Sequence, residues 1–508
     1  MVTKRIVVLG GGTGGTLSAN RLRRLYGRGD AEIVVVDQND DHVYQPGLLF
    51  VPFGLAHAEE LVRSRRHQLH KDIDFRQVPI ERVDMGADSV HLEDGTVLDY
   101  DVLVIATGST LVEEETEGLT GPGWMEKVFT FYDIAGAAAL HDALEAFDGG
   151  RLVVNVIDMP IKCPVAPLEF CFLADWYFRQ AGTRERVELT YVTPLDGAFT
   201  KPVASQRLAG LLEEKGVALV TEFNTGQVDG SGGRLVSYDD REIGFDLAVV
   251  VPLHGGASYV ARSPGLGDEL GFVPVDEHTL QSAAKPNIFA IGDAAGVPTS
   301  KAGSVTHFEG EVLVENVRRF LAAEPLDGTY DGHANCFIET GFGKALLIDF
   351  NYDTEPLPGH FPTSVGLPLL KESRLNHLGK LMFQPLYWHS LLPGRDLPGV
   401  GSAMPIATYA GTAVTVNDEG FFEDPSQWTE AMAPEIARAE GIDELTEPHW
   451  QIIKFMRAEY AEKGSGPTVR VLGKTSGVSV KELYQLFPKG PAKVAAKVAG
   501  IPKPRGCI

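Results

Sequence analysis

The chain has 508 residues, of which 44% are apolar and 22% charged, so it is too long for one hydrophobic core and about three domains are expected. Its formal net charge of −24 argues against DNA as a partner of the whole protein. Its four cysteines are too few for the disulfide scaffold of a secreted protein, and their spacing matches no zinc pattern, so no metal site is predicted.

The N-terminal residues, MVTKRIVVLGGG, run directly into a predicted strand without the apolar segment of a secretory signal. No window contains 18 consecutive apolar residues, so no transmembrane span is predicted. We therefore expect a cytoplasmic protein, and peripheral contact with the inner face of a membrane stays open.

The first predicted strand, Arg5–Leu9, is joined to a predicted helix, Thr16–Tyr26, by a loop with the pattern G-x-G-x-x-G. In this strand–loop–helix setting the pattern is typical of dinucleotide binding, and each glycine has its own role. Gly10 permits the tight turn, Gly12 lets a pyrophosphate approach the backbone, and Gly15 lets the helix pack on the strand. The alternative is an ordinary glycine-rich turn.

The second predicted strand, Glu32–Val36, ends in Asp37. This carboxylate follows Gly15 at about the distance along the chain needed to bind a ribose 2′-hydroxyl. Together with the loop, it predicts an adenine dinucleotide site.

A later predicted strand, Leu152–Ile157, leads into the sequence PIKCPVAPLEFCF, which starts at Pro160. A second nucleotide would need a glycine loop here, but three prolines of this stretch lack the backbone N–H that such a loop offers to a pyrophosphate. The junction therefore presents the thiol of Cys163 instead of an anion cradle. The alternative is that Cys163 is a small buried apolar residue.

Two further strand ends indicate which dinucleotide binds. Asp101–Thr107 is followed by Gly108, and Asn287–Asp293 ends in Gly292 and Asp293. Both segments resemble signatures of the flavoproteins with two dinucleotide-binding domains. The resemblance implies an α/β, Rossmann-like fold and FAD as the cofactor, with Asp293 on the ribityl chain and the N-terminus of the next helix directed at the flavin. The missing second glycine loop argues against a nicotinamide substrate.

Residues 1 to about 400 resemble more narrowly the sulfide:quinone oxidoreductase and flavocytochrome c sulfide dehydrogenase family. Cys163, between Lys162 and Pro164, stands where this family has one redox cysteine, and Cys336 stands where it has the second. Lys301 lies in a segment that resembles the one beside the isoalloxazine. Many quinone-linked members have a third cysteine before this pair, and none precedes Cys163 here.

The resemblance implies a disulfide between the two cysteines that a sulfur nucleophile such as HS⁻ opens. One cysteine then carries a persulfide, and the thiolate of the other passes two electrons to the flavin. We expect Lys162 or a nearby helix N-terminus to lower the pKa of the thiol. The remaining cysteine of this region, Cys171, is expected in the core.

The segment Leu378–Pro398 is rich in large apolar side chains and resembles the aromatic C-terminal part of these flavoproteins, which lies near quinone and membrane. The resemblance implies a quinone as the electron acceptor. The alternative is an internal packing segment.

Small residues and glycine dominate residues 401–410, which we interpret as a linker between a flavoprotein domain of residues 1–400 and a domain of residues 411–508. The last hundred residues resemble the DsrC/TusE sulfur-carrier family, which implies a small, mainly helical domain. The matching motifs are Asp418–Phe421, Asp424-Pro425 with Trp428, Glu440–Ile442, His449-Trp450, Arg470–Leu472 and the tail from Leu486 to Ile508.

In that family the penultimate cysteine carries sulfur on a flexible arm, and Cys507 occupies this place. Many partners of sulfite reductase have a second arm cysteine, at a position where this chain has Ala496, so the domain is more like the TusE-type relay. The tail is locally basic, which favours thiolate and docking on an acidic site. The alternative is a frayed terminus with an incidental cysteine.

The sequence thus predicts a fused sulfur-handling flavoenzyme that oxidises sulfide or persulfide sulfur through Cys163 and Cys336 and exchanges it with Cys507. Its expected partners are a quinone and sulfur-relay proteins, and a homodimer stays open. Two alternatives remain. The first is a flavin-dependent reductase that releases sulfur from Cys507, and the second is a non-catalytic sulfur relay.

Overall fold

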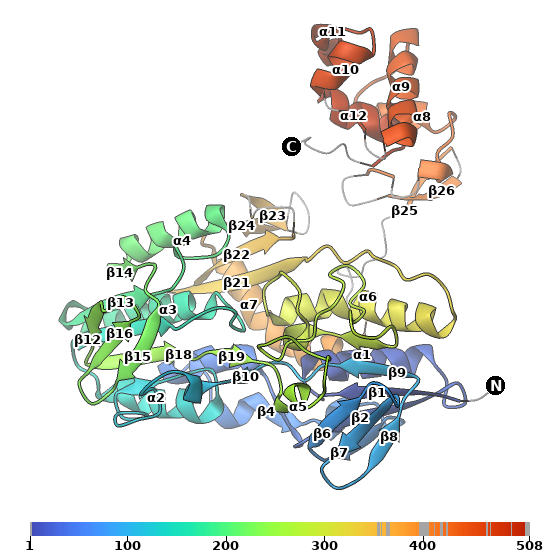
Figure 1. Ribbon diagram of the computed structural model, residues 1–508. Helices are drawn as coiled ribbons and strands as arrows, with labels where there is room; N and C mark the ends of the chain where they lie inside the picture. Colours follow the sequence, from blue (N-terminus) through green and yellow to red (C-terminus); the bar gives the residue numbers. More distant parts are fainter. Residues whose placement is uncertain are drawn as a thin grey trace. The chain divides into compact units, whose positions relative to one another are not determined.

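The computed structural model divides the chain into two compact units, Met1–Asp396 and Leu397–Ile508, which are described separately (Figure 1). The residues that the structure describes are 3–352, 356, 358–361, 366–395, 406–410, 412–416, 420–422, 425–463, 466–467, 469–488 and 490–502. Among the helices in these ranges, none combines the length and the hydropathy needed to cross a bilayer.

The first unit contains a parallel five-stranded sheet in the order β20-β9-β1-β2-β5. Its strands are β1 (Lys4–Leu9), β2 (Ala31–Asp37), β5 (Asp74–Gln77), β9 (Val102–Ile105) and β20 (Ile288–Ala290). The central strands are continuous apolar runs because helices and loops cover both faces of a parallel sheet. Val7 and Leu103, for example, are fully buried in one core cluster.

A second parallel sheet of the same unit has the order β11-β18-β12-β13-β14. Its strands are β11 (Val128–Phe129), β12 (Gly150–Val156), β13 (Val187–Val192), β14 (Val217–Val220) and β18 (Leu247–Val251). Two parallel sheets with covering helices confirm the α/β, Rossmann-like class predicted from the sequence.

Short antiparallel strands and further helices complete the unit. They are β3 (Asp41–Val43), β4 (Val62–Ser64), β6 (Ile80–Asp84), β7 (Ser89–Leu92), β8 (Val97–Asp99), β10 (Thr110–Leu111), β15 (Thr225–Asp229), β16 (Arg234–Ser237), β17 (Glu242–Gly244), β19 (His254–Gly255), β23 (Gly359–Phe361), β24 (Leu367–Leu369), α2 (Ile134–Ala146), α4 (Pro202–Glu214) and α5 (Ser258–Ala261).

Four helices and one hairpin of the first unit position the site. They are α1 (Thr13–Leu25), α3 (Ala166–Ala181), α6 (Gly303–Leu321), α7 (Arg374–Leu386) and the hairpin of β21 (Ala334–Gly341) with β22 (Lys344–Phe350). Helices α1 and α6 lie side by side, and α3 and α7 both pack on the hairpin (Figure 1). A π-helical turn, Tyr387–Leu391, continues α7.

The second unit is mainly helical and has its own hydrophobic core, in which Phe421, Ile453 and Phe487 are fully buried. Its elements are β25 (Ile406–Tyr409), β26 (Thr412–Thr415), α8 (Ala433–Ala439), α9 (Glu447–Lys463), α10 (Val469–Thr475), α11 (Val480–Leu486) and α12 (Pro491–Val498). Strand β25 pairs with β26, so part of the predicted linker 401–410 is a strand. Cys507 lies outside the described residues.

Candidate flavin and cysteine site

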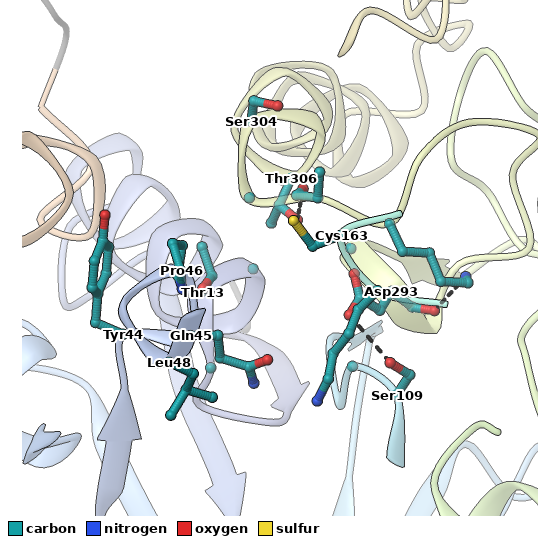
Figure 2. A pocket seen from close by; sticks show the side chains of 18 of the residues that line it. Thr13, Tyr44, Gln45, Pro46, Leu48, Ser109, Cys163, Asp293, Ser304 and Thr306 are labelled. Atoms are coloured by element: carbon teal, nitrogen blue, oxygen red, sulfur yellow. Dashed lines mark hydrogen bonds between the residues drawn. The ribbon is translucent and has the colours of Figure 1, made fainter. Parts of the chain in front are cut away.

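A cavity of about 450 Å³ in the first unit is lined by all the candidate residues of this unit except Gly15. Its lining includes the predicted residues Gly10, Gly12, Asp37, Gly108, Cys163, Gly292, Asp293, Lys301 and Cys336. Figure 2 shows Cys163 and Asp293 on one side of this cavity and Tyr44 and Gln45 on the other. Segments that are far apart in the sequence therefore meet at one site.

The glycine loop between β1 and α1 has the geometry that a pyrophosphate needs. Gly10 has a φ of +91°, and a Cβ there would lie 2.4 Å from the carbonyl oxygen of Ala106, whereas a Cβ on Gly12 would meet nothing within 4 Å. Gly15 does not line the cavity, because it packs against the carbonyl oxygen of Gly10. No side chain caps the first turn of α1, so its N–H groups are available to an anion.

Asp37 is held in place at the end of β2. Its Oδ2 accepts a hydrogen bond of 2.7 Å from the backbone N–H of Gly11, and its carboxylate pairs with the guanidinium of Arg65. Arg65 is largely buried and also lines the cavity. Sequence reasoning missed Arg65, since no local pattern links it to Asp37.

Asp293 and Lys301 belong to the turn that precedes α6. The hydroxyl of Ser109 donates to Oδ2 of Asp293 at 3.2 Å, and the ammonium of Lys301 donates to the carbonyl oxygens of Asp293 at 2.7 Å and Ala295 at 3.2 Å. The same ammonium lies 4.0 Å from the ring centre of Phe272. Lys301 thus lines the cavity, while its charge stabilises the turn that presents Asp293.

The two cysteines reach the cavity from different elements. Cys163 precedes α3 with a φ of +49°, and its N–H donates to the carbonyl oxygen of Lys301 at 2.7 Å. Cys336 lies on β21 and is 8% exposed. Both are free thiols in this structure. Cys171 is fully buried within α3, as expected for a core residue.

Burial controls the electrostatics of the two thiols. It raises the pKa of Cys163 to about 12, and it raises the pKa of Cys336 as well. The carboxylate of Glu169 raises both values further, and the ammonium of Lys380 lowers both. The cation beside the cysteine pair is therefore Lys380.

The expectation for the pKa of Cys163 named Lys162 or a nearby helix N-terminus. The backbone N–H of Ala166, the first residue of α3, lowers this pKa, whereas Lys162 is not among the groups that shift it. The charges that act on Lys162 are those of Asp293, Asp133 and Glu113. Lys162 forms a β-bridge with Lys301, and the positive φ of Cys163 ends the extended conformation directly after it. Adjacency in sequence therefore did not identify the cation that acts on this thiol, which is the ammonium of Lys380.

Glu169 and Lys380 form an ion pair at the cavity wall, with side chains that are 2% and 12% exposed. The backbone N–H of Glu339 donates to the same carboxylate oxygen at 2.6 Å. Sequence reasoning missed both members of the pair. Glu169 is close to Cys163 in the sequence, but its partner Lys380 comes from α7. No local pattern could predict that these two side chains meet.

The segment Leu378–Pro398, which was predicted to lie near a quinone, has some large side chains at the cavity and others on the surface. Phe383 and Tyr387 line the cavity, and the Tyr387 hydroxyl lies 2.7 Å from both the Thr13 hydroxyl and Nε2 of His42. Five apolar side chains of α7 are instead between 38% and 54% exposed, namely Leu375, Leu378, Leu381, Met382 and Leu386. Internal packing therefore accounts for only part of the segment.

Within the described residues, no group of three or more His, Cys, Asp or Glu side chains is arranged to hold a metal ion. The glycine loop, the free first turn of α1 and the two acidic residues fit the pyrophosphate and ribose groups of FAD.

Two family models match separate parts of the chain. Residues 4–154 match the model described as pyridine nucleotide-disulphide oxidoreductase, and residues 408–508 match the model described as DsrC like protein. The second match starts close to the boundary between the two structural units.

The first part of the chain is similar to the mitochondrial sulfide:quinone oxidoreductases. The protein from Dictyostelium discoideum is 28% identical over 399 residues, which are 78% of this chain and 87% of that protein, and the one from Mus musculus is 27% identical over 396 residues. The solved structure of the sulfide:quinone oxidoreductase from Aquifex aeolicus has a TM-score of 0.65 at 21% identity and covers 78% of this chain and 93% of that chain. This structural likeness shows a shared fold.

The last part is similar to the sulfurtransferase TusE of Yersinia pseudotuberculosis, with 43% identity over 107 residues, which are 20% of this chain and 98% of that protein. The gamma subunit of the dissimilatory-type sulfite reductase of Nitratidesulfovibrio vulgaris is 40% identical over 101 residues, covering 96% of that protein.

Proposed function

Because the chain joins an FAD-binding oxidoreductase similar to the sulfide:quinone oxidoreductases to a C-terminal domain that belongs to the DsrC/TusE family, we propose that it oxidises sulfide or persulfide sulfur and transfers it to Cys507. The observation that carries this proposal is that Cys163 and Cys336 line the cavity that the glycine loop equips for FAD.

The chemistry follows from the cysteine pair in its disulfide form. HS⁻ attacks one sulfur, the S–S bond breaks and a new S–S bond forms, and the products are a cysteine persulfide, which keeps the proton of HS⁻, and a cysteine thiolate. Bound FAD supplies a two-electron acceptor for the thiolate. The ammonium of Lys380 stabilises the thiolate by its charge, and the buried wall of the cavity excludes water.

The persulfide sulfur must then leave so that the disulfide can form again. A thiolate on Cys507 would take this sulfur by attacking the outer sulfur of the persulfide, either within one chain or across a homodimer. The S–S bond of the persulfide then breaks, and the cysteine of the pair leaves as a thiolate. The arm that carries Cys507 has Lys503 and Arg505 beside it, which favours its thiolate. Proteins of a sulfur relay would receive sulfur from Cys507.

An anaerobic titration of the flavin with sulfide tests the proposed oxidation. Sulfide should bleach the flavin absorbance, and added quinone should restore it. If the protein is instead a reductase, sulfide should leave the flavin oxidised. A persulfidated Cys507 should then oxidise a previously reduced flavin and release its sulfur. If neither sulfide nor a persulfidated Cys507 changes the flavin absorbance, the protein is a non-catalytic relay.

We further propose that a quinone is the electron acceptor and that α7 contacts a membrane surface peripherally. The exposed apolar side chains of α7 support this, since they lie beside the aromatic residues at the cavity. An interfacial helix buries such a face at the lipid boundary.

The double change Leu378→Ser with Leu381→Ser should weaken binding to vesicles of anionic lipid by about tenfold, because two large apolar groups no longer enter the interface. Cosedimentation with vesicles measures this change, and soluble quinone should still oxidise the flavin of the variant. If the wild-type protein neither binds vesicles nor reduces quinone, α7 serves internal packing.

A further inference from the structure

A carboxyl group that does not line the cavity is buried directly behind its wall. Glu309, in the second turn of α6, is fully buried, and its Oε2 accepts a hydrogen bond of 2.7 Å from the backbone N–H of Gly292. Its other oxygen, Oε1, has no hydrogen-bond partner among the described residues. The ammonium of Lys301 donates to backbone carbonyl oxygens instead. The chain therefore spends a buried acid on one backbone N–H.

Gly292 connects this carboxyl group to the part of the cavity where the cofactor is expected. Gly292 and Asp293 both line the cavity, and so does Thr306 (Figure 2). A Cβ on Gly292 would lie 3.2 Å from Oγ1 of Thr306, and a Cβ on Gly14 would lie 3.2 Å from Cγ2 of the same side chain. The turn that Glu309 holds thus packs, through Thr306, on the first turn of α1, which offers its N–H groups to the pyrophosphate.

The charges around Glu309 favour its neutral form. Burial raises the pKa of Glu309 to about 8 and the charge of Asp293 raises it further, although the backbone hydrogen bond and the ammonium of Lys301 lower it. The charge of Glu309 also acts on the hydroxyls of Tyr330 and Tyr352, but burial raises the pKa of both, so they stay uncharged. One ammonium compensates one carboxylate, and a second buried negative charge without compensation is costly.

We propose that Glu309 is a positioning residue for FAD that carries a proton while the cofactor is bound. The neutral carboxyl group keeps the acceptor that fixes Gly292, and it adds no charge to the wall beside Asp293. Loss of the proton leaves two carboxylates beside the single ammonium of Lys301, and FAD itself carries negative charge on its pyrophosphate.

This arrangement links FAD binding to pH. Because the negatively charged cofactor favours the protonated form of Glu309, FAD should bind fully below the pKa of this group and more weakly as the pH rises above about 8. The amide of a glutamine at this position would accept the same hydrogen bond but could not ionise. Substitution by glutamine therefore separates the charge of Glu309 from its contact with Gly292.

The test measures how fast the full-length holoenzyme releases FAD on dilution at about pH 7 and at about pH 9.5, and the wild-type rate should increase about tenfold between them. Ultrafiltration separates the released FAD, and its fluorescence gives the amount. Glu309→Gln should release FAD slowly at both pH values. Glu309→Ala should release it faster than the wild type at the lower pH, because the N–H of Gly292 loses its acceptor.

Glu315→Gln is the matched control on the same helix. Hydrogen bonds and charges of Arg318 and Arg319 lower the pKa of Glu315 to about 2, so this carboxylate does not titrate in the range tested. The control should keep the wild-type pH profile, and circular dichroism of the same samples excludes unfolding as the cause of release.

Two results would overturn the proposal. In the first, the wild-type protein releases FAD at the same rate at both pH values or releases none. In the second, Glu309→Gln keeps the wild-type pH profile. Since the measurement contains no sulfide, either result leaves the proposed oxidation of sulfide untouched, and a failure of that oxidation does not affect this test.

Discussion

Replacing Cys336 by serine should stop sulfide from reducing the flavin. A serine cannot form the disulfide that HS⁻ opens, and its hydroxyl cannot act as the thiolate that passes electrons on. We expect the rate of flavin bleaching by sulfide to fall by about a thousandfold or more, and Cys163→Ser should have the same effect. Anaerobic stopped-flow absorbance measures this rate.

The matched control is the third cysteine of the same unit. Cys171 is fully buried in α3 and does not line the cavity. Cys171→Ala should therefore keep the sulfide reaction, even if it destabilises the fold slightly. Dithionite should reduce the flavin of every variant, which shows that FAD is bound and reducible. If Cys336→Ser is bleached by sulfide as fast as the wild type, the cysteine pair is not the sulfide site.

Replacing Cys507 by serine should leave the bleaching of the flavin unchanged and alter the fate of the sulfur. Cys507 takes no part in the attack of HS⁻ on the disulfide, but it is the proposed acceptor of the persulfide sulfur. Fusion on one chain gives this acceptor an effective concentration on the order of mM. The variant should therefore release free polysulfide or stop after one turnover until a small thiol is added.

Product analysis during turnover with quinone measures this change, with Cys171→Ala again as the control. Restoration of steady turnover by added thiol would show that only the acceptor is missing. If Cys507→Ser turns over with the wild-type rate and the same sulfur products, the C-terminal domain receives its sulfur elsewhere.

Local patterns in the sequence predicted the nucleotide half of the site. The loop from Gly10 to Gly15 and the carboxylate of Asp37 belong to one βαβ unit, so their spacing along the chain fixes their spacing in the fold. Asp293 and Cys336 were predicted only through the resemblance to known flavoproteins, because their distance from the loop in space depends on the whole tertiary structure.

The electrostatic partners of the cysteines were beyond prediction from sequence. Glu169 and Lys380 meet because α3 and α7 both pack on the hairpin that contains β21. Lys162 was expected beside the thiol because it is adjacent in sequence, but the ammonium that acts on the thiol is that of Lys380, which comes from α7. The linker was predicted from its composition, and composition gives no information on strand pairing. The pairing of β25 with β26 was therefore missed.

The most direct test of the account follows labelled sulfur through the intact protein. Wild-type protein is incubated anaerobically with isotopically labelled sulfide and quinone, and peptide mass spectrometry locates the label on each cysteine. The account predicts a labelled persulfide on Cys507 that is lost in Cys336→Ser. Label that never reaches Cys507 while the flavin turns over would contradict the transfer of sulfur between the two parts of the chain.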